Sequence, residues 1–148
     1  MTDVLDALTP LVKRFEGFAR VVRWQPVPTA VPYLCPAGYW TRGYGILCRA
    51  DDGEITETDA AAELAGILPI YVAHALRLSP SLTGRRLVAI SDFIFNLGPT
   101  RYASSTLRRC VDAGDWQRAR VEIQRWVFGG GRKLPGLVLR RATEATML

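Results

Sequence analysis

The stretch YLCPAGYWTRGYG, residues 33–45, indicates the fold of this 148-residue chain. Its CPAG segment fits a type I turn, because proline suits the second position of that turn and glycine the fourth. Residues Tyr39 to Ile46 then predict a strand, with Thr41 on one face and Arg42 on the other, since strand side chains alternate. Prolines, aromatic residues and β-branched residues crowd the surrounding segment. We therefore expect a small β-rich lobe over about residues 18–54.

A helix is predicted before this lobe. Apolar residues recur there at helical spacing, namely Leu5, Leu8, Leu11, Val12 and Phe15. Pro10 lies inside the pattern, so the helix either kinks there or restarts with Thr9 as its cap. Gly17 is a plausible end of the helix, which places Glu16 at or near its C-terminus.

Helices also dominate the sequence after the lobe. Thr56 to Asp59 resembles a capping box and predicts a long helix to about Leu78, with a kink at Pro69. Further helices are predicted over about 84–95, 105–111, 115–127 and from 135 towards the end, with loops at 96–99 and 129–131. The predicted fold class is α+β, mainly α, in one domain of residues 1–148: the β-rich lobe, and a helical lobe of about 56–148 plus the N-terminal helix.

Composition excludes several classes of protein. Apolar residues make up 49% of the chain, which excludes intrinsic disorder and allows a sizeable core. The longest apolar stretch, Leu64 to Leu78, is interrupted by Pro69, His74 and Arg77, so we expect no membrane-spanning helix. Residues 1–11 lack the basic region of a secretory signal.

Positive charge is concentrated in the C-terminal third. The net charge is +5, with −1 over residues 1–100 and +6 over residues 101–148. This distribution favours a polyanionic partner, which could be nucleic acid, anionic lipid or an acidic cell-wall polymer. The alternative is a solvated helical surface with incidental excess charge.

The cysteines do not suggest a metal site. The chain has Cys35, Cys48, Cys110 and one histidine, without a CxxC pair, so we expect neither zinc nor any other metal. Cys35 and Cys48 both fall in the small lobe and could form a disulfide in an oxidising compartment.

Three residues are candidates for chemistry. Glu16 at a helix C-terminus would face the negative end of the helix dipole, which favours the protonated carboxyl that a general acid requires. Cys35 precedes the tight turn and Thr41 lies six positions later, so the turn can bring a thiol and a hydroxyl to one concave face. Taken singly, the three could equally be a surface glutamate, a small buried cysteine and an ordinary strand threonine.

Phe15-Glu16-Gly17 together with residues 33–45 resembles the phage-type lysozyme (endolysin) family, glycoside hydrolase family 24. The resemblance runs in order from about residue 5 to the end of the chain. Further segments that match the family are Phe95–Gly98, Ser105–Leu107, Trp126 and Gly136–Glu144.

This resemblance implies a lysozyme-like fold, with a small β lobe, a larger helical lobe and an active-site cleft between them. It also implies cleavage of the β-1,4 bond between N-acetylmuramic acid and N-acetylglucosamine in peptidoglycan, without a cofactor. Glu16 falls on the family's catalytic acid, Cys35 on its Asp/Cys position, and Thr41 on the threonine that helps to place water. Whether Cys35 acts as base, electrostatic partner or nucleophile stays open. A thiolate would be favoured by a nearby cation such as Arg42 or Arg20.

The sequence departs from the family pattern in three places. Eighteen residues separate the glutamate from the cysteine, a longer spacing than the family usually has. The extra segment, around 21–30, is expected to loop out near the cleft, where it either contacts substrate through Trp24 or only lengthens the hairpin. Arg42 replaces an isoleucine, and Ile46 replaces a histidine whose role in the family is structural.

The leading hypothesis is a muramidase that degrades host peptidoglycan at the end of a phage lytic cycle. It would leave the host cytoplasm through a holin-type lesion and act on periplasmic glycan strands as a monomer, without stable membrane insertion or nucleic-acid binding. Arg140 or Arg141 is expected to reach Glu16. The alternatives are a lytic transglycosylase that gives 1,6-anhydro products, a wall-binding relative that has lost turnover, and a nucleic-acid binder.

Overall fold

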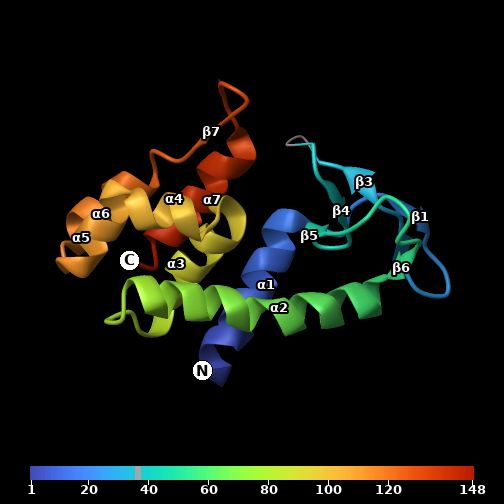
Figure 1. Cartoon of the computed structure of the whole chain (residues 1–148), viewed down its shortest axis with the longest axis horizontal. Helices are drawn as coiled ribbons and strands as arrows, with labels where there is room; N and C mark the ends of the chain where they lie inside the picture. Colours follow the sequence, from blue (N-terminus) through green and yellow to red (C-terminus); the bar gives the residue numbers. More distant parts are fainter. Residues whose placement is uncertain (36–37) are drawn as a thin grey trace. The chain divides into compact units, whose positions relative to one another are not determined.

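The computed structural model describes residues 1–35 and 38–148 (Figure 1). The chain divides into two compact units, one of Met1–Leu8 with Leu68–Leu148 and the other of Thr9–Ile67. Helices α1 (Thr2–Glu16) and α2 (Glu57–Leu78) each contribute residues to both units. Helices predominate and the sheets are small, which confirms the predicted α+β, mainly α, class.

Helix α1 continues through Pro10 and does not restart there. Three residues at helical spacing form its buried stripe: Val4, Leu8 and Val12. The helix ends at Glu16 because Gly17 adopts a left-handed φ of 65°, and the Gly17 N–H donates to the Lys13 carbonyl at 3.0 Å.

Two small antiparallel sheets make up the β structure of the unit Thr9–Ile67. One has the order β1-β2-β6, with β1 Val21–Arg23, β2 Thr29–Ala30 and β6 Ile55–Thr56. The other has the order β3-β4-β5, with β3 Tyr33–Leu34, β4 Trp40–Arg42 and β5 Ile46–Leu47.

The predicted continuous strand from Tyr39 to Ile46 is wrong. Strand β4 ends at Arg42, and the chain reverses into β5, with which it pairs. The reversal is possible because Gly43 and Gly45 have φ values of 59° and 75°, which a side-chain-bearing residue rarely adopts. The extra segment 21–30 is a β-hairpin, β1–β2, whose second strand also pairs with β6.

Helix α2 begins as predicted. The Thr56 hydroxyl accepts the Asp59 N–H at 3.1 Å and also donates to the Asp59 carboxylate at 2.8 Å. Five residues form its fully buried stripe: Ala60, Leu64, Leu68, Val72 and Ala75. By length and composition α2 could also cross a membrane, with a mean hydropathy of 1.3 in its most apolar window, so the expected absence of a membrane-spanning helix stays a prediction.

The other unit contains the remaining helices and a two-stranded hairpin. Its elements after α2 are α3 Gly84–Leu97, α4 Pro99–Ser104, α5 Thr106–Asp112, α6 Trp116–Ile123, β7 Phe128–Gly129, β8 Arg132–Lys133 and α7 Pro135–Ala145. No element was predicted over residues 100–104, where α4 lies; Pro99 is suited to a first helical turn and starts this helix. The hairpin β7–β8 replaces the glycine loop expected at 129–131, and α6 ends at Ile123, before the predicted 127.

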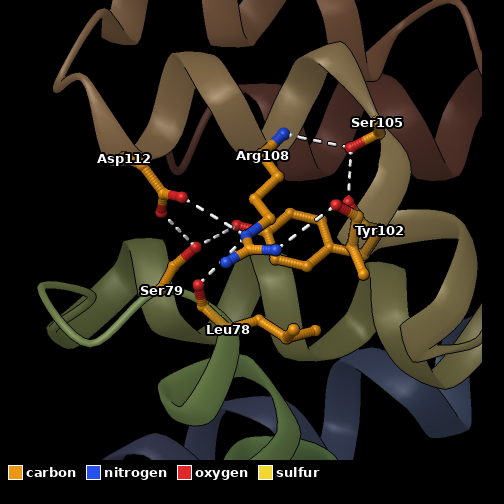
Figure 2. Close-up of polar contacts among 7 residues, drawn as sticks. Leu78, Ser79, Tyr102, Ser105, Arg108 and Asp112 are labelled. Atoms are coloured by element: carbon orange, nitrogen blue, oxygen red, sulfur yellow. Dashed lines mark hydrogen bonds and ion pairs between the residues drawn. The ribbon is translucent and has the colours of Figure 1, made fainter.

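A buried polar network joins the end of α2 to α4 and α5 (Figure 2). The Ser79 hydroxyl donates to Asp112 Oδ1 at 2.6 Å and lies 2.8 Å from the Tyr102 hydroxyl. Arg108 Nε donates to the Leu78 carbonyl at 3.1 Å, which satisfies an acceptor at the helix end. Burial raises the pKa of Tyr102 to about 12.

A second buried cluster consists of charged residues of α3 and α7. Asp92 accepts two hydrogen bonds from Arg140, at 2.9 and 2.7 Å, and Glu144 accepts one from Arg141 at 2.7 Å. The Arg141 guanidinium also lies 4.9 Å from the centroid of the Phe93 ring. Burial raises the pKa of Glu144, and the Arg141 charge opposes that shift.

Candidate functional site

Glu16, the last residue of α1, is half-buried and lies against the turn between β4 and β5. A Cβ atom placed on Gly45 would be 2.7 Å from Glu16 Oε2 and 3.3 Å from its carboxyl carbon. A side chain on residue 45 would therefore displace the Glu16 carboxylate. The helix stop at Gly17 and the turn glycine at Gly45 together fix the place of this acid.

Thr41 is the central residue of β4 and is buried, with 5% of its surface exposed. It pairs with Tyr33 of β3 and Leu47 of β5. Its hydroxyl donates to the Tyr33 carbonyl at 3.4 Å, a long and hence weak hydrogen bond. The same oxygen can accept a hydrogen bond from another group, such as a water molecule.

Cys35 follows β3 directly and is half-buried. Its N–H donates to the Tyr39 carbonyl at 2.9 Å, which extends the β3–β4 register by one pair. Because Tyr39 lies two residues before Thr41, the thiol of Cys35 and the hydroxyl of Thr41 belong to the same face of the sheet. The structure thus brings these two predicted residues together.

The turn predicted after Cys35 is described only in part. The Gly38 N–H donates to the Cys35 carbonyl at 2.8 Å, the bond that closes a four-residue turn. Its two central residues, 36 and 37, lie outside the described part of the chain, so the type I assignment stays a prediction.

Cys48 lies on the opposite face of this sheet. Its N–H donates to the Trp40 carbonyl at 2.9 Å, so it belongs to the face of Trp40 and Arg42. Cys35, Cys48 and Cys110 are all free thiols, and the suggested Cys35–Cys48 disulfide is absent. Burial raises the pKa of the Cys48 thiol, and the charge of Arg42 opposes the shift.

Arg42 and Arg20 were suggested as cations beside the Cys35 thiol, but Arg42 forms its hydrogen bonds on the other face of the sheet. Arg42 donates to Glu63 at 2.7 Å and to the Asp52 carbonyl at 2.8 Å, on the Cys48 face. Arg20 lies 5.6 Å from the centroid of the Tyr33 ring, and Tyr33 is on the face of Cys35 and Thr41. Arg20 reaches this position with a left-handed φ of 60°, a strained conformation that no local sequence signal predicts.

The arrangement offers a carboxyl group, a thiol and a hydroxyl within one compact unit, Thr9–Ile67. Over residues 1–35 and 38–148, no group of three or more His, Cys, Asp or Glu side chains could hold a metal ion. Arg140 and Arg141 are held by Asp92 and Glu144, and a contact of either arginine with Glu16 stays a prediction. Such a site can carry acid catalysis on a bond that needs protonation of its leaving oxygen.

Comparisons with known proteins identify the family of this chain. The family model for phage lysozyme matches residues 13–144. An endolysin of Acyrthosiphon pisum secondary endosymbiont phage 1 is 32% identical over 143 residues, covering 93% of this chain and 91% of the relative. A SAR-endolysin of Escherichia phage Mu is 41% identical over 76 residues, which are 51% of this chain and 44% of that relative. The chain also matches 53% of the length of an endolysin of Bacillus phage B103, at 31% identity, with 98% of this chain covered.

Solved structures give the same result. The muramidase domain of SpmX from Asticaccaulis excentricus has a TM-score of 0.79 at 29% identity, covering 95% of this chain and 93% of that one. An endolysin from Escherichia coli O157:H7 phage FAHEc1 has a TM-score of 0.73 at 25% identity, covering 99% and 90% of the two chains. The fold is therefore shared with these structures.

Proposed function

Because this chain belongs to the phage lysozyme family, we propose that it is a peptidoglycan hydrolase that lyses a bacterial host. The bond it cleaves is the β-1,4 bond between N-acetylmuramic acid and N-acetylglucosamine. One observation carries the proposal: the carboxylate of Glu16 lies against Gly45 in the same compact unit in which Cys35 and Thr41 share a sheet face.

Glu16 is the general acid in this proposal. It gives its proton to the leaving glycosidic oxygen while positive charge develops at the anomeric carbon. General acid catalysis of this kind contributes roughly 100- to 10,000-fold in rate.

Cys35 and Thr41 position and deprotonate the water molecule that attacks the sugar. In an inverting reaction the second group stands roughly 6.5–9.5 Å from the acid and removes a proton from water on the opposite face of the sugar. The Thr41 hydroxyl accepts a hydrogen bond from that water, and the Cys35 thiolate takes its proton as the new carbon–oxygen bond forms. Arg20 lies over the Tyr33 ring, on the same face of the sheet.

A lytic transglycosylase is the second candidate, and the identity of Cys35 favours it. A carboxylate is absent at this position, and a thiol is mostly neutral at pH 7 unless a cation stabilises the thiolate. In that reaction Glu16 alone provides acid and base catalysis. The sugar's own hydroxyl replaces water and gives a 1,6-anhydro product.

The substrate of the proposed enzyme is the periplasmic glycan strand of the host. The enzyme is made in the host cytoplasm and reaches the wall through a holin-type membrane lesion, as a monomer. The net charge of +6 over residues 101–148 attracts the chain to an anionic wall. No cofactor takes part.

The test compares the wild-type protein with Glu16→Gln on suspended purified peptidoglycan. The variant should lower the rate of turbidity loss by about 100-fold or more, because the amide cannot donate the required proton. Sedimentation with the wall should stay unchanged. The matched control is Glu54→Gln, which removes an exposed carboxylate of the same unit, bound to Arg23 at 2.7 Å.

Retained lysis by Glu16→Gln would contradict the general-acid role. Wall binding without any release of sugars, by well-folded wild-type protein, would instead point to a binding protein that has lost turnover.

A further inference from the structure

Four apolar side chains of the hairpin β7–β8 and the start of α7 are exposed to solvent. They are Phe128, Leu134, Val138 and Leu139, with exposed fractions of 63%, 40%, 36% and 52%. They come from the hairpin and from the beginning of the helix that follows it (Figure 1). Phe128 pairs with Lys133, so these two side chains share one face of the hairpin, and Leu134, the next residue, lies on the other face. Val138 and Leu139 line one cavity together with Lys133, and we call Phe128, Val138 and Leu139 the apolar patch. An exposed apolar cluster in one place marks an interaction surface more often than scattered single residues do.

The patch borders a shallow cavity of about 450 Å³. The cavity is lined by Lys133, Pro135, Val138, Leu139 and Ala142. Four of these five lining residues belong to α7, so they form one face of its first turns. Apart from the ammonium group of Lys133, the lining side chains are apolar.

The charged residues in the sequence segment that carries the patch are all basic. Residues 123–143 contain no aspartate or glutamate, and Arg132 and Lys133 of β8 are both exposed. The two basic residues of α7, Arg140 and Arg141, are buried against Asp92 and Glu144 and do not form this surface. Exposed cations are thus close in sequence to the exposed apolar side chains, with no acidic residue between them.

We propose that the apolar patch, with Lys133, docks on the surface of an anionic lipid bilayer. The combination matches interfacial binding, in which apolar side chains enter the headgroup boundary and flanking cations contact anionic headgroups. A wall polymer or a nucleic acid would use the positive charge but leave the apolar side chains of the patch without a role. This inference uses none of Glu16, Cys35 and Thr41 and does not depend on the proposed hydrolysis.

The experiment measures cosedimentation of the folded full chain with vesicles that contain no peptidoglycan. One set of vesicles is phosphatidylcholine, and the other is phosphatidylcholine mixed with phosphatidylglycerol. The protein should bind the mixed vesicles and bind phosphatidylcholine weakly, and binding should weaken with added salt. Leu139→Asp should lower the partition coefficient by about tenfold or more, because it removes apolar burial and adds a charge that anionic lipid repels.

The matched control is Val121→Asp, which places the same charge on an apolar side chain that is 54% exposed on α6, outside the patch. It should retain most of the binding. Absence of binding to either kind of vesicle, or equal losses in the two variants, would overturn the proposal. Self-association that depends on protein concentration and is abolished by Leu139→Asp would also overturn it, since the patch would then bind a second copy of the chain.

Discussion

The carboxylate of Glu16 touches the backbone of Gly45, so closely that a Cβ atom on Gly45 would lie 2.7 Å from Oε2. This contact joins the end of α1 to the β4–β5 turn. Glycine is needed there for two reasons, the φ of 75° and the close approach of the acid. The turn thus acts as a positioning element for the proposed general acid.

Gly45→Ala should lower the hydrolysis rate by about 100-fold, because a displacement of a catalytic group by about 1 Å has an effect of that order. Gly53→Ala is the matched control. Gly53 has a similar φ of 69°, but a Cβ there meets no atom within 4 Å. Both variants should show similar losses of stability in urea, and only Gly45→Ala should lose activity. Equal activities in the two folded variants would show that the contact does not position Glu16.

Substitutions at Cys35 test its share in the chemistry. Cys35→Ala should reduce the initial rate of sugar release by about 100-fold, because no group then accepts the proton of water. Cys35→Asp should retain much of the activity, since a carboxylate can serve as base. The measurement is the production of reducing ends from purified peptidoglycan. If Cys35→Ala matches the wild type, the thiol has no catalytic role.

The positions of the helices could largely be predicted because the residues that start and end a helix lie next to it in the sequence. Thr56 and Ser105 accept N–H groups at the starts of α2 and α5, Pro135 starts α7, and Gly17 ends α1. The shared face of Cys35 and Thr41 also followed from local turn and strand patterns.

Other features depend on contacts between distant segments. The sequence around Gly43 to Gly45 is compatible with a continuous strand as well as with a chain reversal. Only the pairing between β4 and β5 distinguishes the two. The contact between Glu16 and Gly45 and the strained backbone of Arg20 likewise arise from packing. The sequence predicted the identity of the acid from a resemblance, but it did not predict what holds the acid in place.

Stability should depend on pH through Tyr102. The pKa of Tyr102 is about 12 in the folded state and 10.0 in the unfolded state. Its contribution to the free energy of unfolding is therefore complete below pH 10 and is lost as the pH rises towards 12. By pH 11 the loss from this residue is about 1.4 kcal/mol. The free energy of unfolding, measured with urea at each pH, should therefore fall less between pH 9 and 11 in Tyr102→Phe than in the wild type. An unchanged slope would show that the buried phenol is not linked to unfolding.

The buried pair of Arg141 and Glu144 gives a stability prediction. Both side chains are fully buried, and Arg141 donates to Glu144 at 2.7 Å. Arg141→Met should lower the free energy of unfolding by about 3–5 kcal/mol, because it leaves a buried carboxyl without its main partner. The double variant Arg141→Met/Glu144→Gln should recover part of this loss in urea unfolding, since Asp92 and Arg140 remain paired. A double variant less stable than Arg141→Met would contradict this interpretation.

The most direct test of the proposed function is mass spectrometry of muropeptides released from purified peptidoglycan in heavy-oxygen water. The enzyme that we propose should give reducing ends that carry the heavy label, because the oxygen that attacks the anomeric carbon comes from water placed by Cys35 and Thr41. Glu16→Gln should release almost none. Unlabelled 1,6-anhydro ends from the wild-type protein would contradict hydrolysis and assign the reaction to a transglycosylase centred on Glu16.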